Sequence, residues 1–288
     1  MKYTLLIAFA LAATLLLNKQ AHADIPHSFR IPIQTDGYGA KTNVATWAGA
    51  RGGASSNVSS PSGDTLAVYS WCSDLATDTF KVGRAYLWSD TINSASYIDS
   101  INDITAGNSV RFDSLEIPLT GVRFVDNGGC SGWFYLYAHD SCIVNANNYS
   151  AGKTYGVLDF NDIWSPALTT TWVLVDSVQG STIGTGPTVV TFTITDRTIL
   201  DEIECMIALG GSPLALGFCI VSCHDQSNTQ PAPSADYNSK VSFYALENAG
   251  ADPYCMVYWT EVEPDDELDW FNSNPYNQLP FGTKPFNQ

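Results

Sequence analysis

The chain has 288 residues, and its 29 acidic residues outnumber its 13 basic ones, which gives a formal net charge of −16 at pH 7. So acidic a protein is a poor match for nucleic acid, because binding to phosphates depends on Lys and Arg side chains. The balance suits an exported protein and one that binds cations. We therefore expect no nucleic-acid partner.

The first 23 residues have the organisation of a secretory signal peptide. Lys2 supplies a positive charge, LLIAFALAATLLL an apolar run, and AHA, which ends at Ala23, a small-residue cleavage site. The apolar run is too short to cross a bilayer, and no later segment approaches the ~20 apolar residues of a spanning helix. We expect an exported protein, secreted or at the cell surface, with no membrane span.

Short β-branched and aromatic runs, separated by turn-forming residues, dominate the chain between residues 36 and 260. The predicted strands are TLAVYSW (65–71), RAYLWS (84–89), SVRFDSLEIPL (109–119), WFYLYA (133–138), TWVLVDSV (171–178), TVVTFTIT (188–195), ALGFCIVS (215–222), KVSFYAL (240–246) and YCMVYW (254–259).

Several of these runs alternate apolar and polar residues, as TVVTFTIT does, which is typical of antiparallel strands with one covered face. Many such strands predict an all-β fold, an antiparallel β-sandwich of jelly-roll type over residues 36–260. One short helix is predicted near 198–208, where apolar residues recur at helical spacing within DRTILDEIECMIALG.

Two extended terminal arms flank this domain, an N-terminal arm (24–35) and a C-terminal tail (261–288). Pro26 and Pro32 exclude a central strand but allow an edge strand or a docked arm. The tail holds six acids in the nine residues EVEPDDELD, followed by Pro, amide and aromatic residues. We expect one arm to mediate self-association or contact with another surface protein; the alternative is a monomer with two frayed termini.

Four segments are similar to a known domain in their order along the chain: DGYGAKTNVATWAGARGGASS (36–56), GRAYLWSDTINSASYIDSINDI (83–104), VTFTITDRTILDEIECMIALGGSPLALGFCIVSCHD (190–225) and VSFYALENAGADPYCMVYW (241–259). They resemble the DNRLRE-like β-sandwich domain of bacterial secreted and phage-associated surface proteins. The match departs from the family at 88–91, where Trp-Ser-Asp-Thr stands in place of Phe-Asp-Thr. The resemblance implies a structural, adhesive or carbohydrate-binding role without a shared catalytic motif.

The stretch GFCIVSCHD brings Cys219, Cys223 and His224 together in sequence and has four interpretations: haem attachment, a metal site, disulfide bonding or one face of a strand. In a strand the two cysteines lie on one face, about 13 Å apart. They are then too distant to bond one another, which requires Cα atoms within about 7 Å, or to hold a haem without breaking the strand. We therefore favour a structural role over metal or haem.

Seven cysteines lie in the exported part of the chain, where disulfides form and persist, and the odd number leaves at least one unpaired within a single chain. The pairings we expect join Cys255 to Cys219 or Cys223, and Cys130 to Cys142, although spacing alone does not decide connectivity.

The acidic loops make calcium the one plausible ion, and no other cofactor is expected. FVDNGGCSG contributes Asp126 and Asn127, and CHDQSN contributes Asp225 and Asn228, whose oxygens are of the kind that Ca²⁺ prefers. The alternative is that these four are ordinary turn residues.

Exposed tryptophans offer a second kind of site, a flat platform for sugar rings made of Trp47, Trp71 and Trp164. The alternative is that the rings pack between the sheets.

No enzyme mechanism is evident: no G-x-S-x-G segment occurs, and no spacing of carboxylates encodes a glycosidase pair. The pairs His139-Asp140 and His224-Asp225 are expected to form loop hydrogen bonds. We expect an exported non-catalytic structural or adhesive surface protein, with a lectin-like carbohydrate-binding module as the alternative and a glycan-active enzyme as a distant third.

Overall fold

A computed structural model of the protein describes residues 26–51, 58–59, 65–74, 79–91, 109–128, 130–139, 172–184, 186–208, 215–246, 248 and 253–262. The signal peptide (1–23) and nearly all of the C-terminal tail lie outside the described residues. Within the described part, no helix is long and apolar enough to cross a membrane.

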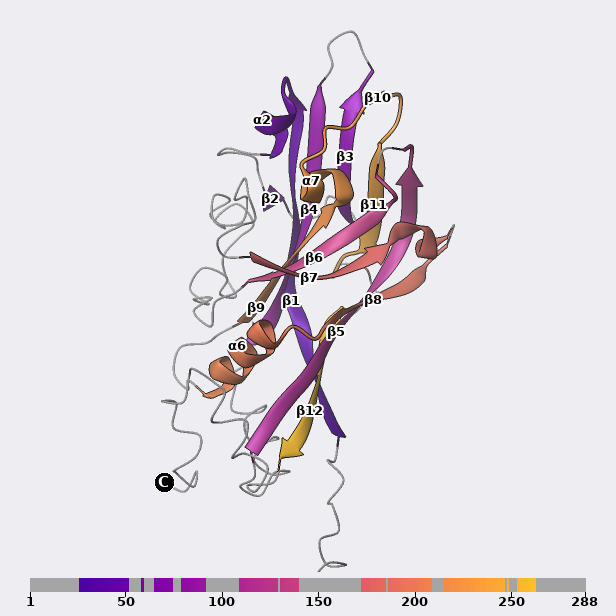
Figure 1. The fold of residues 1–288 in the computed structure, drawn as a ribbon. Helices are drawn as coiled ribbons and strands as arrows, with labels where there is room; N and C mark the ends of the chain where they lie inside the picture. Colours follow the sequence, from indigo (N-terminus) through magenta and orange to yellow (C-terminus); the bar gives the residue numbers. More distant parts are fainter. Residues whose placement is uncertain are drawn as a thin grey trace, which may run out of the picture.

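The fold is an all-β sandwich, and each of the predicted strands is present (Figure 1). The strands are β1 (Pro26–Val44), β2 (Val58–Ser59), β3 (Thr65–Ser73), β4 (Phe80–Thr91), β5 (Ser109–Asp126), β6 (Trp133–His139), β7 (Trp172–Gln179), β8 (Thr188–Ile194), β9 (Ala215–Ser222), β10 (Pro233–Ser234), β11 (Ser239–Tyr244) and β12 (Tyr254–Val262).

Among the described residues, three short α-helices and one 3₁₀ turn interrupt the strands: α2 (Trp47–Arg51), α6 (Arg197–Ala208), α7 (Cys223–Ser227) and η1 (Gly180–Ile183). The helix predicted near 198–208 is α6. Its residues Ile199, Leu200 and Ile203 are buried in the core, which explains the helical spacing of apolar residues in the sequence. The other two α-helices were not predicted, because a five-residue helix has too little periodicity to detect.

Hydrogen bonding runs through the strands in the order β10-β3-β11-β5-β12-β1-β4-β9-β6-β7, with β8 beside β5. An additional β3–β4 pairing closes β3, β11, β5, β12, β1 and β4 into a ring. The ring closes because long strands change neighbours: β5 pairs with β12 over Ser109–Glu116 and with β11 over Gly121–Asp126. Between the described strands, the pairings are antiparallel except β10–β3, which is parallel.

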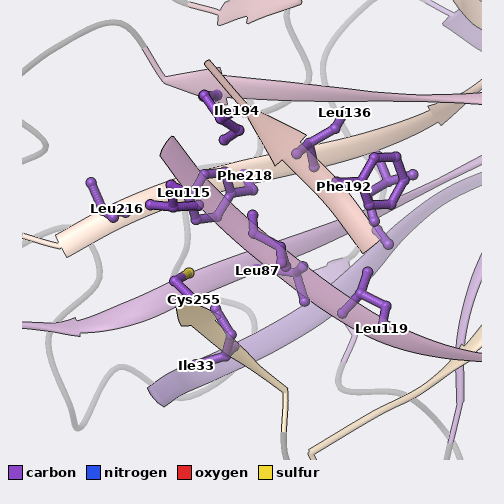
Figure 2. Packing of buried hydrophobic residues seen from close by; sticks show 14 of the residues in the cluster. Ile33, Leu87, Leu115, Leu119, Leu136, Phe192, Ile194, Leu216, Phe218 and Cys255 are labelled. Carbon is purple, nitrogen blue, oxygen red and sulfur yellow. The ribbon is translucent and has the colours of Figure 1, made fainter. Parts of the chain in front are cut away.

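The main hydrophobic core is built by buried residues of β1, β3, β4, β5, β6, β8, β9, β11, β12 and α6. Figure 2 shows part of it, where Leu87, Leu115 and Phe218 come from three different strands. The alternation read in TVVTFTIT is confirmed, since Val190, Phe192 and Ile194 are buried in the core while Thr191 and Thr193 are exposed.

A second cluster lies on the opposite face of β4, β9 and β6, and includes Tyr86, Trp88, Cys219 and Val221. Strand β9 is therefore buried along its whole length, which accounts for the continuous apolar run ALGFCIV.

The N-terminal arm is part of the sheet, so the domain boundary drawn at residue 35 is wrong. Residues Pro26–Pro32 pair with β12, and Ile31 and Ile33 are buried in the main core. The Ile33 N–H donates to the Pro253 carbonyl at 3.1 Å, so the backbone N–H groups of odd-numbered residues in this segment point toward β12 and those of even-numbered residues point away from it. Pro26 and Pro32 are even-numbered, and no described strand lies on that side of the segment. The missing N–H of each proline therefore breaks no strand pairing, as expected for an edge strand.

Candidate functional site

Asp225 lies in α7, where the chain turns directly out of the buried strand β9. Ser222 is still extended, with φ −79° and ψ 162°, and the helix begins at the next residue. The helix ends at Asn228, which adopts a left-handed conformation (φ 55°, ψ 32°) that Asn tolerates well. This short helix buries the side chain of Asp225 instead of leaving it on a surface loop.

Two arginines from distant segments converge on the Asp225 carboxylate. Arg84 of β4 donates from Nε to Oδ2 at 2.6 Å and from Nη2 to Oδ1 at 2.9 Å. Arg51, the last residue of α2, donates from Nε to Oδ1 at 3.0 Å and from Nη2 to the Asp225 main-chain carbonyl at 2.6 Å. We call these three residues the Arg–Asp cluster. It ties α2, β4 and α7 together through charge-assisted, partly bidentate hydrogen bonds.

The Arg–Asp cluster is closed to solvent. The side chains of Arg84 and Asp225 are 0% exposed and that of Arg51 is 13% exposed. Burial alone would lower the pKa of Arg84, but the charge and the hydrogen bonds of Asp225 outweigh it and raise that pKa above its ordinary value. Arg84 is therefore a permanent cation, held in place by its counter-ion.

Two neutral side chains, Tyr86 and Cys219, line the cluster on neighbouring strands. Tyr86 stands opposite Cys219 in the β4–β9 pairing, and both are fully buried. Burial raises the pKa of Tyr86 well above its usual value and raises the pKa of Cys219 to about 12. At neutral pH Cys219 is a thiol and lacks the thiolate that nucleophilic attack or metal binding requires.

His224 forms a hydrogen bond within its loop, as the sequence predicted. Its Nδ1 lies 3.0 Å from the main-chain oxygen of Thr229, and the side chain is buried. Since the arginines occupy the carboxylate of Asp225, His224-Asp225 is not an acid–base pair. The side chain of His139, the other predicted loop histidine, lies outside the described residues.

The disulfide found in the described chain joins Cys130 to Cys223, with a Cα–Cα distance of 5.9 Å. Both predicted pairings are therefore wrong. Strand β6 lies beside β9 with Phe134 opposite Ser222, and this register brings the turn before β6 to the first residue of α7. Cys142 lies outside the described residues.

The predicted Cys255–Cys219 disulfide is also excluded, because the two thiols lie on opposite sides of the sheet. Cys255 lies in the main core, whereas Cys219 lies in the second cluster on the opposite side of the sheet. Neither Cys219 nor Cys255 is in a disulfide. With Cys223 in a disulfide and Cys219 a buried thiol, the Cys219–Cys223–His224 stretch has the structural role favoured from its sequence.

The four residues predicted to bind calcium do not form one site. Asp225 is bonded to two arginines, whose charges would repel a cation, and the prediction is wrong for this residue. Asp126 accepts the Gly128 N–H at 3.1 Å, and Asn127 donates to the Tyr237 carbonyl at 2.9 Å, as turn residues do. Among the described residues, no group of three His, Cys, Asp or Glu side chains is placed to hold a metal.

Of the three predicted platform tryptophans, the two that the structure describes do not share a surface. Trp47 is 6% exposed and packs edge-on against Phe80 in the second cluster, with ring centroids 6.0 Å apart, so its assignment to a platform is wrong. Trp164 lies outside the described residues. Trp71 is half-buried on the outer side of β3, where its Nε1 donates to the Ser234 carbonyl at 2.9 Å.

Sequence reasoning missed Arg51 and Arg84 as partners of Asp225, although the sequence contained a signal for all three. Each of the three lies in a different segment of the resemblance: Arg51 in 36–56, Arg84 in 83–104, and Asp225 at the end of 190–225. The charged side chains of three separate segments thus meet in one cluster of the fold.

The fold and the cluster together define an all-β sandwich protein with an internal ion-pair network and a disulfide. No family model matches the chain, and no curated protein is similar to it in sequence. The likeness to DNRLRE-type domains stays a prediction.

Proposed function

We propose that the chain is an exported, non-catalytic structural subunit of an extracellular assembly. The observation that carries this proposal is the closure of the Arg–Asp cluster: both oxygens of Asp225 are bonded to arginine within the protein. A catalytic charge cluster must contact its substrate, whereas the side-chain contacts described for this one join α2, β4 and α7. Its chemistry serves the fold.

The covalent cross-link supports the same role. The Cys130–Cys223 disulfide spans 93 residues and ends on the helix that carries Asp225. In the chain-entropy account, closing a loop of this length stabilises a protein by about 4–5 kcal/mol. Such a bond persists in oxidising compartments, in agreement with the signal-peptide pattern of residues 1–23.

The direct test is the size and the location of the mature protein. We expect the protein to appear outside the secreting cell, cleaved after Ala23, and to form oligomers whose mass rises with concentration in light scattering. A protein retained in the cell, or one that stays monomeric at high concentration and low salt, would contradict the proposal.

Carbohydrate binding is the second candidate, and the placement of Trp71 favours it. The ring lies half-buried on the outer side of β3, with Tyr237 at a centroid distance of 5.1 Å. Adjacent aromatic rings of this kind can stack on the apolar faces of sugars. A glycan array probed with wild type and Trp71→Ala separates the two roles, since a lectin would lose its signals in the variant while a subunit would show none.

A further inference from the structure

A set of cations and aromatic rings gathers on the outer face of β3, β4, β5 and β11, and we call it the cationic–aromatic patch (Trp71, Lys81, Arg123, Tyr237 and Lys240). Lys81 Nζ lies 4.1 Å from the centre of the Trp71 ring, and Lys240 Nζ lies 4.3 Å from the centre of the Tyr237 ring. The sheet fixes this arrangement, because Lys81 stands opposite Trp71 in the β3–β4 pairing and Arg123 stands opposite Ser242 in the β5–β11 pairing.

The positive charge of the patch is not neutralised within the described part of the protein. None of Lys81, Arg123 and Lys240 forms a salt bridge there, whereas Arg51, Arg84, Arg111 and Arg197 each do. Burial and the charge of Arg123 lower the pKa of Lys240, and the charge of Asp236 acts in the opposite direction. In a chain of net charge −16, this patch is a place where a carboxylate-rich ligand would be attracted.

The chain itself contains a segment of matching chemistry. Glu261–Asp269 holds six acids, and Trp270 and Phe271 follow at once. The acids complement the patch cations, and the aromatic residues complement its rings.

The segment of the same copy is too far away to reach the patch. Strand β5 runs from the start of the acidic segment to the patch. Its residue Ser109 pairs with Val262 at the end of β12, and its residue Val125 pairs with Lys240 of the patch. At about 3.3 Å per residue, these two points of β5 are roughly 50 Å apart along the strand. Asp269 follows Val262 by seven residues, which extend at most about 25 Å. Figure 1 shows the end of β12 and the strands β3 and β11 at opposite ends of the molecule.

We infer that the acidic segment 261–269 of one copy binds the cationic–aromatic patch of a second copy. The two surfaces differ, so the contact is head-to-tail and builds an open filament or a ring, not a two-fold dimer. This inference rests on the proposed function, because it names the contact that would hold the assembly together.

The test uses the mature protein with its tail intact and three charge variants. Lys81→Glu/Lys240→Glu reverses the patch, and Lys81→Arg/Lys240→Arg preserves the patch charge as the matched control. Lys in place of Glu263, Asp265, Asp266, Glu267 and Asp269 together reverses the segment, since five of its six negative charges then become positive. Association is measured at low salt by sedimentation velocity, and circular dichroism and melting confirm that each variant folds. If the patch reversal does not fold, Arg123→Glu replaces it, because that side chain is exposed.

We expect each reversal alone to weaken association by about tenfold or more, since like charges then meet at the contact. An equal mixture of the two reversed proteins should associate again, because the acidic patch of one protein can bind the basic segment of the other. The arginine control should associate as wild type does. Raising the salt to about 1 M, where the screening length is about 3 Å, should weaken wild-type association.

Three results would overturn the inference, and they are distinguishable from one another. Wild type that assembles while the reversals have no effect removes this contact but leaves the proposed function standing. Wild type that stays monomeric removes both. A patch reversal that abolishes binding to an acidic oligosaccharide such as heparin, but leaves association unchanged, assigns the patch to a glycan.

Discussion

Arg84 and Asp225 are 141 residues apart in the sequence and form a bidentate ion pair in which neither side chain is exposed to solvent. Removing two charges from water costs several kcal/mol for each ion, and this cost is offset only when geometry and hydrogen bonding are good. Arg51 supplies further donors to the same residue, so the carboxylate is satisfied on both oxygens. The pair therefore determines that β4 and α7 meet, in addition to any contribution that it makes to stability.

Removal of the Asp225 charge should be costly. We expect Asp225→Asn to lower the free energy of unfolding by about 3–5 kcal/mol, because Arg84 then stays buried without its counter-charge. Denaturant unfolding with the disulfide intact measures this. The matched control is Asp113→Asn, which breaks the exposed pair with Arg111 and should cost less than about 1 kcal/mol. Equal effects of the two substitutions would show that the cluster is not a structural centre.

Loss of the disulfide should also destabilise the protein. We expect Cys130→Ser/Cys223→Ser to reduce the free energy of unfolding by about 4–5 kcal/mol, as the unfolded chain gains the freedom of an open 93-residue loop. Peptide mapping of unreduced wild type should recover one linked pair that contains these two cysteines. Recovery of a Cys130–Cys142 peptide in its place would contradict the pairing.

The local pattern of the sequence predicts the strands well because each strand shows its own periodicity. TVVTFTIT alternates since one side of β8 faces the core, and ALGFCIVS does not since β9 is covered on both faces. Pairing partners leave no such local trace. The neighbourhood of β6 and β9, which brings Cys130 to Cys223, joins segments about ninety residues apart, so spacing pointed to the nearer Cys142 instead.

The buried site is harder to predict for a related reason. An aspartate that follows a strand resembles an exposed calcium ligand in sequence, and only the turn into α7 directs Asp225 inward. Trp47 failed as a platform residue in the same way, since α2 places it against Phe80. Composition alone does not distinguish a buried ring or carboxylate from an exposed one.

The N-terminal segment provides a test of the corrected domain boundary. Ile31→Ala should lower the free energy of unfolding by about 2–5 kcal/mol, because its side chain is fully buried in the main core. Ser28→Ala, in the same strand segment but exposed, should change it by less than about 0.5 kcal/mol. If Ile31→Ala had no more effect than Ser28→Ala, the segment would be a loosely docked arm, as the sequence first indicated.

Glu204 of α6 should make stability depend on pH. Burial raises the pKa of its carboxyl, although hydrogen bonds from the Phe112 N–H and from Arg197 act in the opposite direction. A raised folded-state pKa means that the native protein binds a proton more readily than the unfolded chain does. The contribution of Glu204 to the free energy of unfolding therefore falls as pH rises above the unfolded-state pKa of about 4.5.

We expect Glu204→Gln, which keeps the shape but not the charge, to have a higher melting temperature than wild type at pH 7 and the same melting temperature near pH 4. The control Ser28→Ala, which changes no titratable group and lies at an exposed position, should leave the difference in melting temperature between pH 7 and pH 4 as in wild type. A Glu204→Gln protein that melts below wild type at pH 7 would show that the ion pair with Arg197 outweighs the desolvation of the carboxylate.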